Sequence, residues 1–121
     1  MFILINKICN WNAIRHDQEH DPLLTTSLLI EEIEEFADAS LQEDKVEQID
    51  ALVDIIYVAI GALWKLGLQP QQIFKAIDIV CISNDTKDID KPKLGIKANR
   101  IKGINYIPPT ERLTKLVREL K

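Results

Sequence analysis

The sequence predicts an all-α protein, an antiparallel helical bundle of four main helices with a short fifth helix at the C-terminus. Apolar residues recur at intervals of three and four through most of the chain, which is the spacing of amphipathic helices. No segment carries a convincing ladder of strand residues. With 121 residues, of which 46% are hydrophobic and 28% are charged, the chain can bury one core. We therefore expect residues 1–121 to form a single domain.

Apolar stripes predict the first two helices. One stripe runs along Phe2–Arg15 and is followed by a polar break that ends at Pro22. A second stripe begins near Leu23–Thr26 and continues to about Ser40, again with helical spacing. The polar loop that follows, residues 41–44, is short, which is typical of a connection between antiparallel helices.

The third and longest helix is expected from about Lys45 to Leu66. Gly67 is well placed to end it, because glycine adopts the left-handed conformation that commonly closes helices. The fourth helix opens at Gln69–Pro70, since proline is accommodated in a first turn, and it stops at Ser83–Asn84.

Beyond the fourth helix the composition changes. Residues 85–109 are rich in Lys, Asn, Gly and Pro and predict a loop, with a small hairpin around Ile101–Ile107. A final helix is expected from about Thr110 to Leu120, because apolar residues again line one side of that segment.

Composition and charge argue against several classes of protein. The 15 basic and 19 acidic residues give a net charge of −4, which is unlike a general binder of nucleic acid polymers. The longest nearly apolar stretch, Ile55–Trp64, is far shorter than the roughly 20 residues of a membrane-spanning helix. Lys7 interrupts the N-terminus too early for a signal peptide. Cys9 and Cys81 lack metal-type spacing and are interpreted as buried free thiols, so we expect a cytoplasmic protein without a membrane partner.

Charges are distributed unevenly along the chain. Between Glu31 and Asp54 there are ten acidic residues and one basic residue, Lys45, whereas ten basic and four acidic residues follow from Lys87 onward. An acidic middle and a basic tail suit a site for a metal and a polyanion, and they equally suit two solvated surfaces.

Helical spacing gathers the acids into two strips. Glu31 and Glu32 each lie within about 60° of Glu35 on the second helix, as do Glu47, Asp50 and Asp54 of one another on the third. Asp54 stands in the apolar run Ala-Leu-Val-Asp-Ile-Ile-Tyr-Val-Ala-Ile. A buried carboxylate there costs several kcal/mol unless it is paired or coordinates a metal. Ligation by oxygen alone favours Mg²⁺, with Mn²⁺ as the alternative.

Two other metal chemistries fit the residues less well. A carboxylate-bridged di-iron bundle, which would carry out redox chemistry, needs Glu-x-x-His pairs, and the sequence contains none. His16 and His20 are four residues apart and could bind zinc, but their polar neighbours predict a solvent-exposed turn instead.

Four motifs occur in order within about residues 23–113. They are Glu31-Glu32-Ile33-Glu34-Glu35, Asp50-x-x-x-Asp54-Ile55-Ile56-Tyr57, Ser83-Asn84-Asp85-Thr86-Lys87 and Lys102-Gly103-Ile104-Asn105-Tyr106-Ile107-Pro108-Pro109. Together they resemble the all-α nucleoside triphosphate pyrophosphohydrolase superfamily, and in particular its small MazG-like proteins. That superfamily also includes phosphoribosyl-ATP pyrophosphohydrolases and dimeric dUTPases.

The chain departs from the superfamily at one position. The common pattern on the second acidic helix is Glu-x-x-Asp, which would place glutamate where this chain has Ala51. Asp50 is the first candidate to replace that ligand, because it lies four residues before Asp54. Glu47 also fits the spacing, so the fourth ligand stays open between Asp50 and Glu47.

The resemblance implies hydrolysis between the α- and β-phosphates of a nucleoside or deoxynucleoside triphosphate, with Mg²⁺ bound, as part of nucleotide-pool housekeeping. The implied site consists of metal ligands Glu32, Glu35, Asp50 and Asp54, catalytic residues Glu31 and Lys87, and substrate-binding residues Asn84, Lys87, Lys102 and Tyr57. Glu31 would hold a second metal or position water, the lysines would meet phosphates, and Tyr57 would stack on the base.

The resemblance also implies self-association, as dimers or dimers of dimers. A non-catalytic helical adaptor that retains the fold is the alternative function, and Ala51 is the residue that keeps it open. Three further aromatic residues could stack on a base, although aromatic residues on apolar stripes usually belong to the core: Trp11, Phe36 and Trp64.

Overall fold

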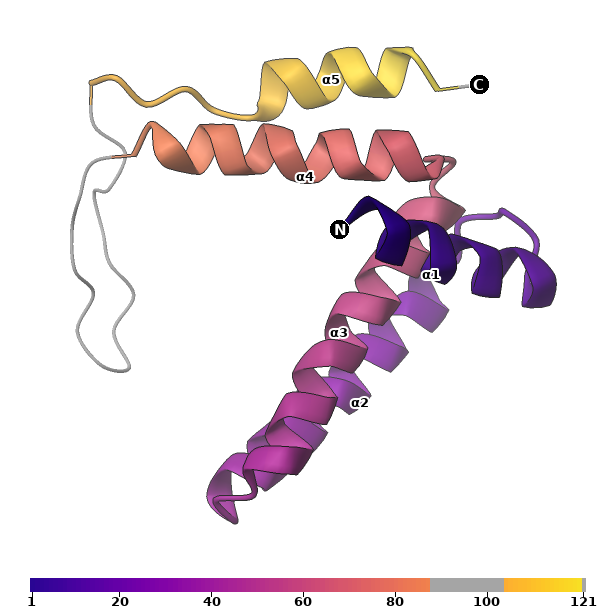
Figure 1. The fold of residues 1–121 in the computed structure, drawn as a ribbon, viewed down its shortest axis with the longest axis vertical. Coiled ribbons are helices and arrows are strands. Elements are labelled where there is room, and N and C mark those ends of the chain that lie inside the picture. The colour runs from indigo at the N-terminus through magenta and orange to yellow at the C-terminus, as the bar shows by residue number, and fades with distance from the viewer. Residues whose placement is uncertain (88–103, 121) are drawn as a thin grey trace. The chain divides into compact units, whose positions relative to one another are not determined.

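The computed structural model describes residues 1–87 and 104–120, and all regular structure among them is helical. The helices are α1 (Phe2–Arg15), α2 (Pro22–Leu41), α3 (Lys45–Lys65), α4 (Pro70–Asp85) and α5 (Thr110–Arg118) (Figure 1). The prediction of an all-α protein is therefore confirmed, and each helix begins and ends within about two residues of its expected limits. The expected hairpin at Ile101–Ile107 begins at residues that lie outside the described ones, and residues 104–107 contain no strand.

The chain forms two compact units, residues 1–73 and residues 74–121. Each unit has its own packing. That residues 1–121 form a single domain, and that four helices close into one antiparallel bundle, both stay predictions.

In the first unit, α2 and α3 form a helical hairpin, and among the described residues their contact is the most extensive between two helices. Carboxylates cap both helices at their N-termini: Asp21 accepts a hydrogen bond from the amide of Leu24, and Asp44 accepts one from the amide of Glu47, each at 3.1 Å. Such caps satisfy amide groups that have no partner within the helix. The caps therefore fix where the two acid-bearing helices begin.

The C-terminus of α3 is closed by Gly67, as the sequence predicts. Gly67 has a φ of 105°, its amide donates to the carbonyl of Trp64 at 3.0 Å, and the amide of Leu68 donates to the carbonyl of Leu63 at 3.3 Å. This is the paired hydrogen-bond pattern of a Schellman end. Gln18, in the loop after α1, donates from Nε2 to the same carbonyl of Trp64 at 2.8 Å. The loop between α1 and α2 is thereby tied to the end of α3.

Helix α1 packs on α3 through one buried face, which carries Ile5, Ile8 and Cys9. Gly61 of α3 allows a close approach, because a Cβ at that position would lie 3.0 Å from the side-chain amide atoms of Asn12. The free thiol of Cys9 is buried, as expected, but Cys81 is exposed. The prediction for Cys81 was wrong because the stripe of α4 on which it lies is not covered there.

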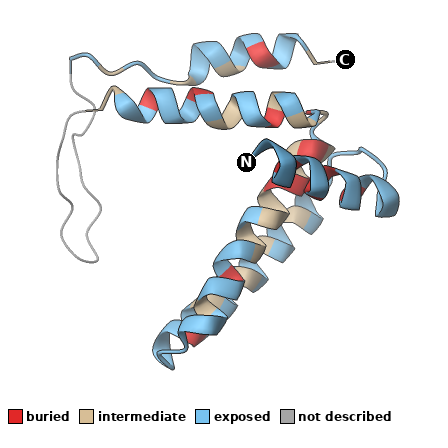
Figure 2. Cartoon of the chain, viewed as in Figure 1, coloured by how far each residue is buried: buried red, intermediate tan, exposed pale blue. Residues whose placement is uncertain are grey.

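Much of the outer surface of the α2–α3 hairpin is exposed (Figure 2), and many of the exposed residues are large and apolar. On α3, Val46, Ile49, Val53 and Ile56 are all exposed and follow one another at intervals of three, four and three residues. That spacing produces a continuous apolar stripe of the kind found in coiled coils. We call these four residues the α3 stripe.

In the second unit, α4 is linked to the residues on either side of α5. Lys75 Nζ lies 3.8 Å from Glu119 Oε2, and Ser83 near the end of α4 donates from Oγ to the carbonyl of Ile107 at 2.7 Å. Leu116 of α5 is buried.

In the described residues no single helix is long and apolar enough to cross a membrane; α3 and α4 taken as one broken span reach that length and composition.

Candidate functional site

Glu32 stands at the centre of a group of carboxylates on α2 and α3. Its Oε2 atom is buried and has no hydrogen-bond partner among the described residues. Desolvation is the main cause that raises the pKa of Glu32 from 4.5 to about 7, followed by a hydrogen bond with Glu35 and by the charges of Asp54, Glu35 and Glu31. The charges of three acids from two helices therefore act on Glu32.

The cluster contains some of the predicted ligands and not others. Glu35, Asp54 and Glu31 are the acids whose charges act on Glu32, and Asp50 is not among them. In residues 1–87 and 104–120, no three His, Cys, Asp or Glu side chains are already arranged around one point as metal ligands. The assignment of individual ligands stays a prediction.

Three residues of α3 bear on the identity of the fourth metal ligand. Asp50 is exposed, while Glu47 lines a hollow of about 210 Å³ together with Glu35 and Asp38. Ala51, where the superfamily pattern has glutamate, is 1% exposed. Position 51 thus belongs to the apolar core in this chain, whereas Asp50 is exposed to solvent and Glu47 lines the hollow.

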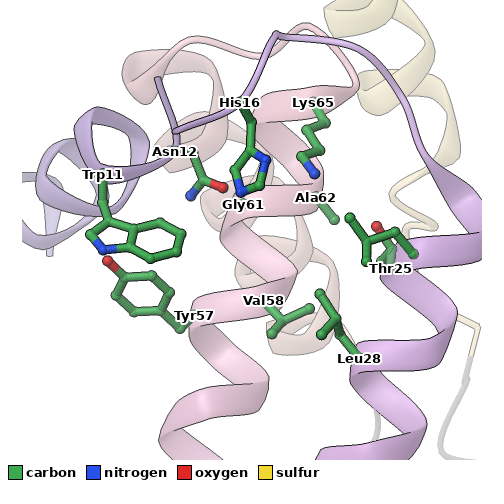
Figure 3. A pocket seen from close by; sticks show the side chains of 11 residues that line it. Trp11, Asn12, His16, Thr25, Leu28, Tyr57, Val58, Gly61, Ala62 and Lys65 are labelled. Carbon is green, nitrogen blue, oxygen red and sulfur yellow. The ribbon is translucent and has the colours of Figure 1, made fainter. Parts of the chain in front are cut away.

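An apolar pocket of about 380 Å³ lies between α1, α2 and α3 (Figure 3). It adjoins the carboxylates, because Leu28 precedes Glu32 by one turn on α2 and Tyr57 follows Asp54 by about one turn on α3. Its lining residues are Trp11, Asn12, His16, Leu24, Thr25, Leu28, Tyr57, Val58, Gly61, Ala62 and Lys65. Tyr57 and Trp11 were anticipated from the sequence, whereas Asn12, His16, Gly61 and Lys65 were not.

Two aromatic rings form one wall of this apolar pocket. Trp11 and Tyr57 meet edge to face, with ring centroids 5.6 Å apart and an interplanar angle of 87°. The guanidinium carbon of Arg15 lies 4.3 Å from the centre of the Trp11 ring. Trp64, by contrast, is buried and serves the core.

A polar hollow adjoins the apolar pocket and shares His16, Leu24 and Lys65 with it. His16 and His20 both line this hollow, and both are exposed, as expected. Their surroundings include three acids, Asp17, Glu19 and Asp21.

In the second unit, the two C-terminal motifs contact each other. The hydroxyl of Thr86 accepts a hydrogen bond from the amide of Ile107 at 2.8 Å, while Ser83 binds the carbonyl of the same residue. Lys87 Nζ lies 6.0 Å from the centre of the Tyr106 ring. Asn84 is exposed near the end of α4, and Lys102 lies outside the described residues.

The model of one protein family, described as phosphoribosyl-ATP pyrophosphohydrolase, matches residues 11–79, more than half of the chain. The match includes the apolar pocket and both acid-bearing helices. Nothing matches among the curated proteins or among the solved structures. The chain therefore belongs to the phosphoribosyl-ATP pyrophosphohydrolase family, a helical family of nucleotide pyrophosphohydrolases.

Proposed function

We propose that the protein is a Mg²⁺-dependent hydrolase that cleaves a nucleoside or deoxynucleoside triphosphate between its α- and β-phosphates. The products are a nucleoside monophosphate and pyrophosphate. The observation that carries the proposal is the buried, unpartnered Oε2 of Glu32 among Glu31, Glu35 and Asp54. A carboxylate in that position is stabilised either by a proton or by a cation, and hard oxygen donors favour Mg²⁺.

In this proposal Glu32, Glu35 and Asp54 hold the metal, and Asp50 or Glu47 completes the set. Mn²⁺ would fit the same oxygen donors. When bound, the ion neutralises phosphate charge, orients the polyphosphate and lowers the pKa of water. Glu47 is favoured by the hollow that it shares with Glu35, and Asp50 by its spacing from Asp54.

The remaining residues act on water and substrate. Glu31 positions the attacking water, or holds a second ion, from the edge of the cluster. Lys87 and Lys102 neutralise the phosphates as point charges. Asn84 donates to ribose or phosphate oxygens, and Tyr57 packs against the base.

Self-association belongs to the same proposal. The α3 stripe is exposed in the single chain, and its spacing suits packing against a second copy as a dimer or tetramer. The stripe lies on the same helix as Asp54, so α3 would carry both a subunit interface and part of the carboxylate cluster. A cytoplasmic role in maintaining the nucleotide pool is consistent with such an activity.

The decisive experiment incubates the purified chain and Mg²⁺ with a panel of ribo- and deoxyribonucleoside triphosphates and with phosphoribosyl-ATP. Pyrophosphate and orthophosphate are measured separately. Release of pyrophosphate supports the proposal, and release of orthophosphate alone would show that another bond is cleaved. If neither product is released with Mg²⁺ or with Mn²⁺, a non-catalytic adaptor is favoured. Ala51, which is buried where the superfamily pattern has glutamate, is the residue that keeps this alternative open.

Two variants test whether the hydrolytic activity resides at the carboxylates. Asp54→Asn should abolish turnover while circular dichroism remains helical, because a metal ligand is removed without a change of shape. Glu34→Gln is the matched control, since Glu34 is an exposed acid on the same turn of α2 as the cluster. Undiminished activity of the Asp54→Asn variant would remove Asp54 from the site.

A further inference from the structure

The apolar pocket has an apolar rim and a polar floor. Trp11, on the rim, is 42% exposed, and Leu24 and Leu28 are also exposed, whereas Asn12 is only 6% exposed and Gly61 is buried. A volume of about 380 Å³ lies within the range of small-molecule sites, which are commonly apolar with a few fixed polar groups. The flat Trp11 and Tyr57 rings and the aliphatic Leu28 and Val58 surround a space suited to a planar ring (Figure 3).

The side-chain amide of Asn12 is held in one orientation. Its Nδ2 atom donates to the carbonyl of Ile8 at 2.8 Å, and a carbonyl can only accept, so the nitrogen must face Ile8. The Oδ1 atom has no hydrogen-bond partner among the described residues. The pocket floor therefore offers a hydrogen-bond acceptor.

Gly61 holds the amide from the other side. A Cβ at position 61 would lie 3.0 Å from both Nδ2 and Oδ1 of Asn12, which is closer than nearly all real contacts. Because glycine lacks that atom, the backbone of α3 lies directly against the amide. Asn12 is thus fixed by Ile8 on its own helix and by Gly61 on α3.

We infer that the pocket binds the base of the substrate and that Asn12 determines specificity by accepting a hydrogen bond from an exocyclic amino group. This inference rests on the proposed function, which places the phosphates at the carboxylates. In this orientation the sugar lies over Leu28 and points toward Glu32. The part of the base farthest from the sugar therefore contacts the floor of the pocket. That part is the 4-amino group of cytosine or the 6-amino group of adenine, whereas uracil, thymine and guanine place an oxygen there.

Chemically matched nucleosides test the inference without phosphate or metal. Cytidine is compared with uridine, and adenosine with inosine, in the presence of a chelator, because each pair differs chiefly at the group that would meet Asn12. Binding is followed by NMR through the indole N–H resonances of the two tryptophans, Trp11 and Trp64. We expect the amino member of each pair to bind about tenfold more tightly, the effect of one hydrogen bond, and to shift the Trp11 resonance.

Asn12→Ala should bring the affinities within each pair together, because the acceptor is removed while the aromatic wall stays. Asn10→Ala, an exposed residue on the same helix, is the matched control and should keep the preference. Gly61→Ala should weaken the preference by displacing the amide, and this variant tests the same point if Asn12→Ala fails to fold. Adding Gly61→Ala to Asn12→Ala should change nothing further, because the clash is with the Asn12 side chain.

Equal binding of both members of each pair to the parent chain would overturn the inference. So would a preference that survives in Asn12→Ala, or the lack of any Trp11 shift at millimolar nucleoside. None of these outcomes bears on pyrophosphate release, which tests the proposed function separately. Conversely, a chain without hydrolytic activity that still prefers the amino nucleosides would retain the pocket and lose the enzyme.

Discussion

The hydroxyl of Thr86 offers a sharp test of how the C-terminal segment is held. It accepts a hydrogen bond from the amide of Ile107 at 2.8 Å and donates one to the carbonyl of Ser83 at 2.7 Å. Thr86→Val removes both bonds and keeps the shape of the side chain, whereas Thr86→Ser keeps the hydroxyl and loses only a methyl group.

The size of the effect follows from the two bonds. Each intramolecular hydrogen bond contributes about 1 kcal/mol net. The bond to Ile107 joins segments far apart in sequence, whereas the bond to Ser83 is local. Ile107 is an exposed residue, so water can replace part of what is lost. We therefore expect Thr86→Val to lower the free energy of opening this segment by about 1–2 kcal/mol.

Amide hydrogen exchange measured by NMR reads this free energy at one residue. The amide of Ile107 should exchange about 5- to 30-fold faster in Thr86→Val, since 1.4 kcal/mol corresponds to a factor of ten. Thr86→Ser should stay close to the parent. If the Ile107 amide exchanges at the parent rate in Thr86→Val, or equally fast in both variants, the hydroxyl does not hold the segment.

Three further predictions concern charge, association and phosphate binding. Because the pKa of Glu32 is raised to about 7 from 4.5, the metal-free fold binds a proton that the unfolded chain has lost, so its stability should fall as the pH rises from about 4.5 through 7. Urea unfolding with chelator should show that slope, and Glu32→Gln should flatten it; a steep slope in the variant would assign it elsewhere. Replacing both Val53 and Ile56 with glutamate should yield monomers by light scattering if the α3 stripe joins two copies, and an unchanged mass would exclude the stripe as an interface. Lys87→Ala should raise the KM for a triphosphate or lower kcat, and steady-state values equal to the parent's would remove Lys87 from the site.

Helix limits were predictable because local chemistry sets them. Pro70 and Gly67 act through their own backbone preferences, so no tertiary information is needed to place a helix start or end at them. The exposure of Cys81 was not predictable in this way. An apolar stripe indicates that a face can be buried, but what covers each part of it depends on segments distant in the sequence.

The same distinction between local and long-range information applies to the candidate site. The convergence of Glu32, Glu35 and Asp54 could be anticipated from helical spacing and from the short loop between the two helices. Asn12 and Gly61 could not, because they are about fifty residues apart and neither is unusual in its own helix. Asp54 is only partly buried even though its neighbours are apolar, since Val53 and Ile56 beside it are exposed.

The family match begins at residue 11, in the middle of α1, and this has a practical consequence for anyone who trims the protein. Ile5, which has 0% exposure, and Ile8 precede the matched region but supply much of the surface by which α1 adheres to α3. A fragment that spans residues 11–79 would expose the α1–α3 contact surface to water and would release Trp11 from its fixed position. Ligand studies on such a fragment would then report on a loosened wall, so the first ten residues are best treated as an integral part of the binding unit.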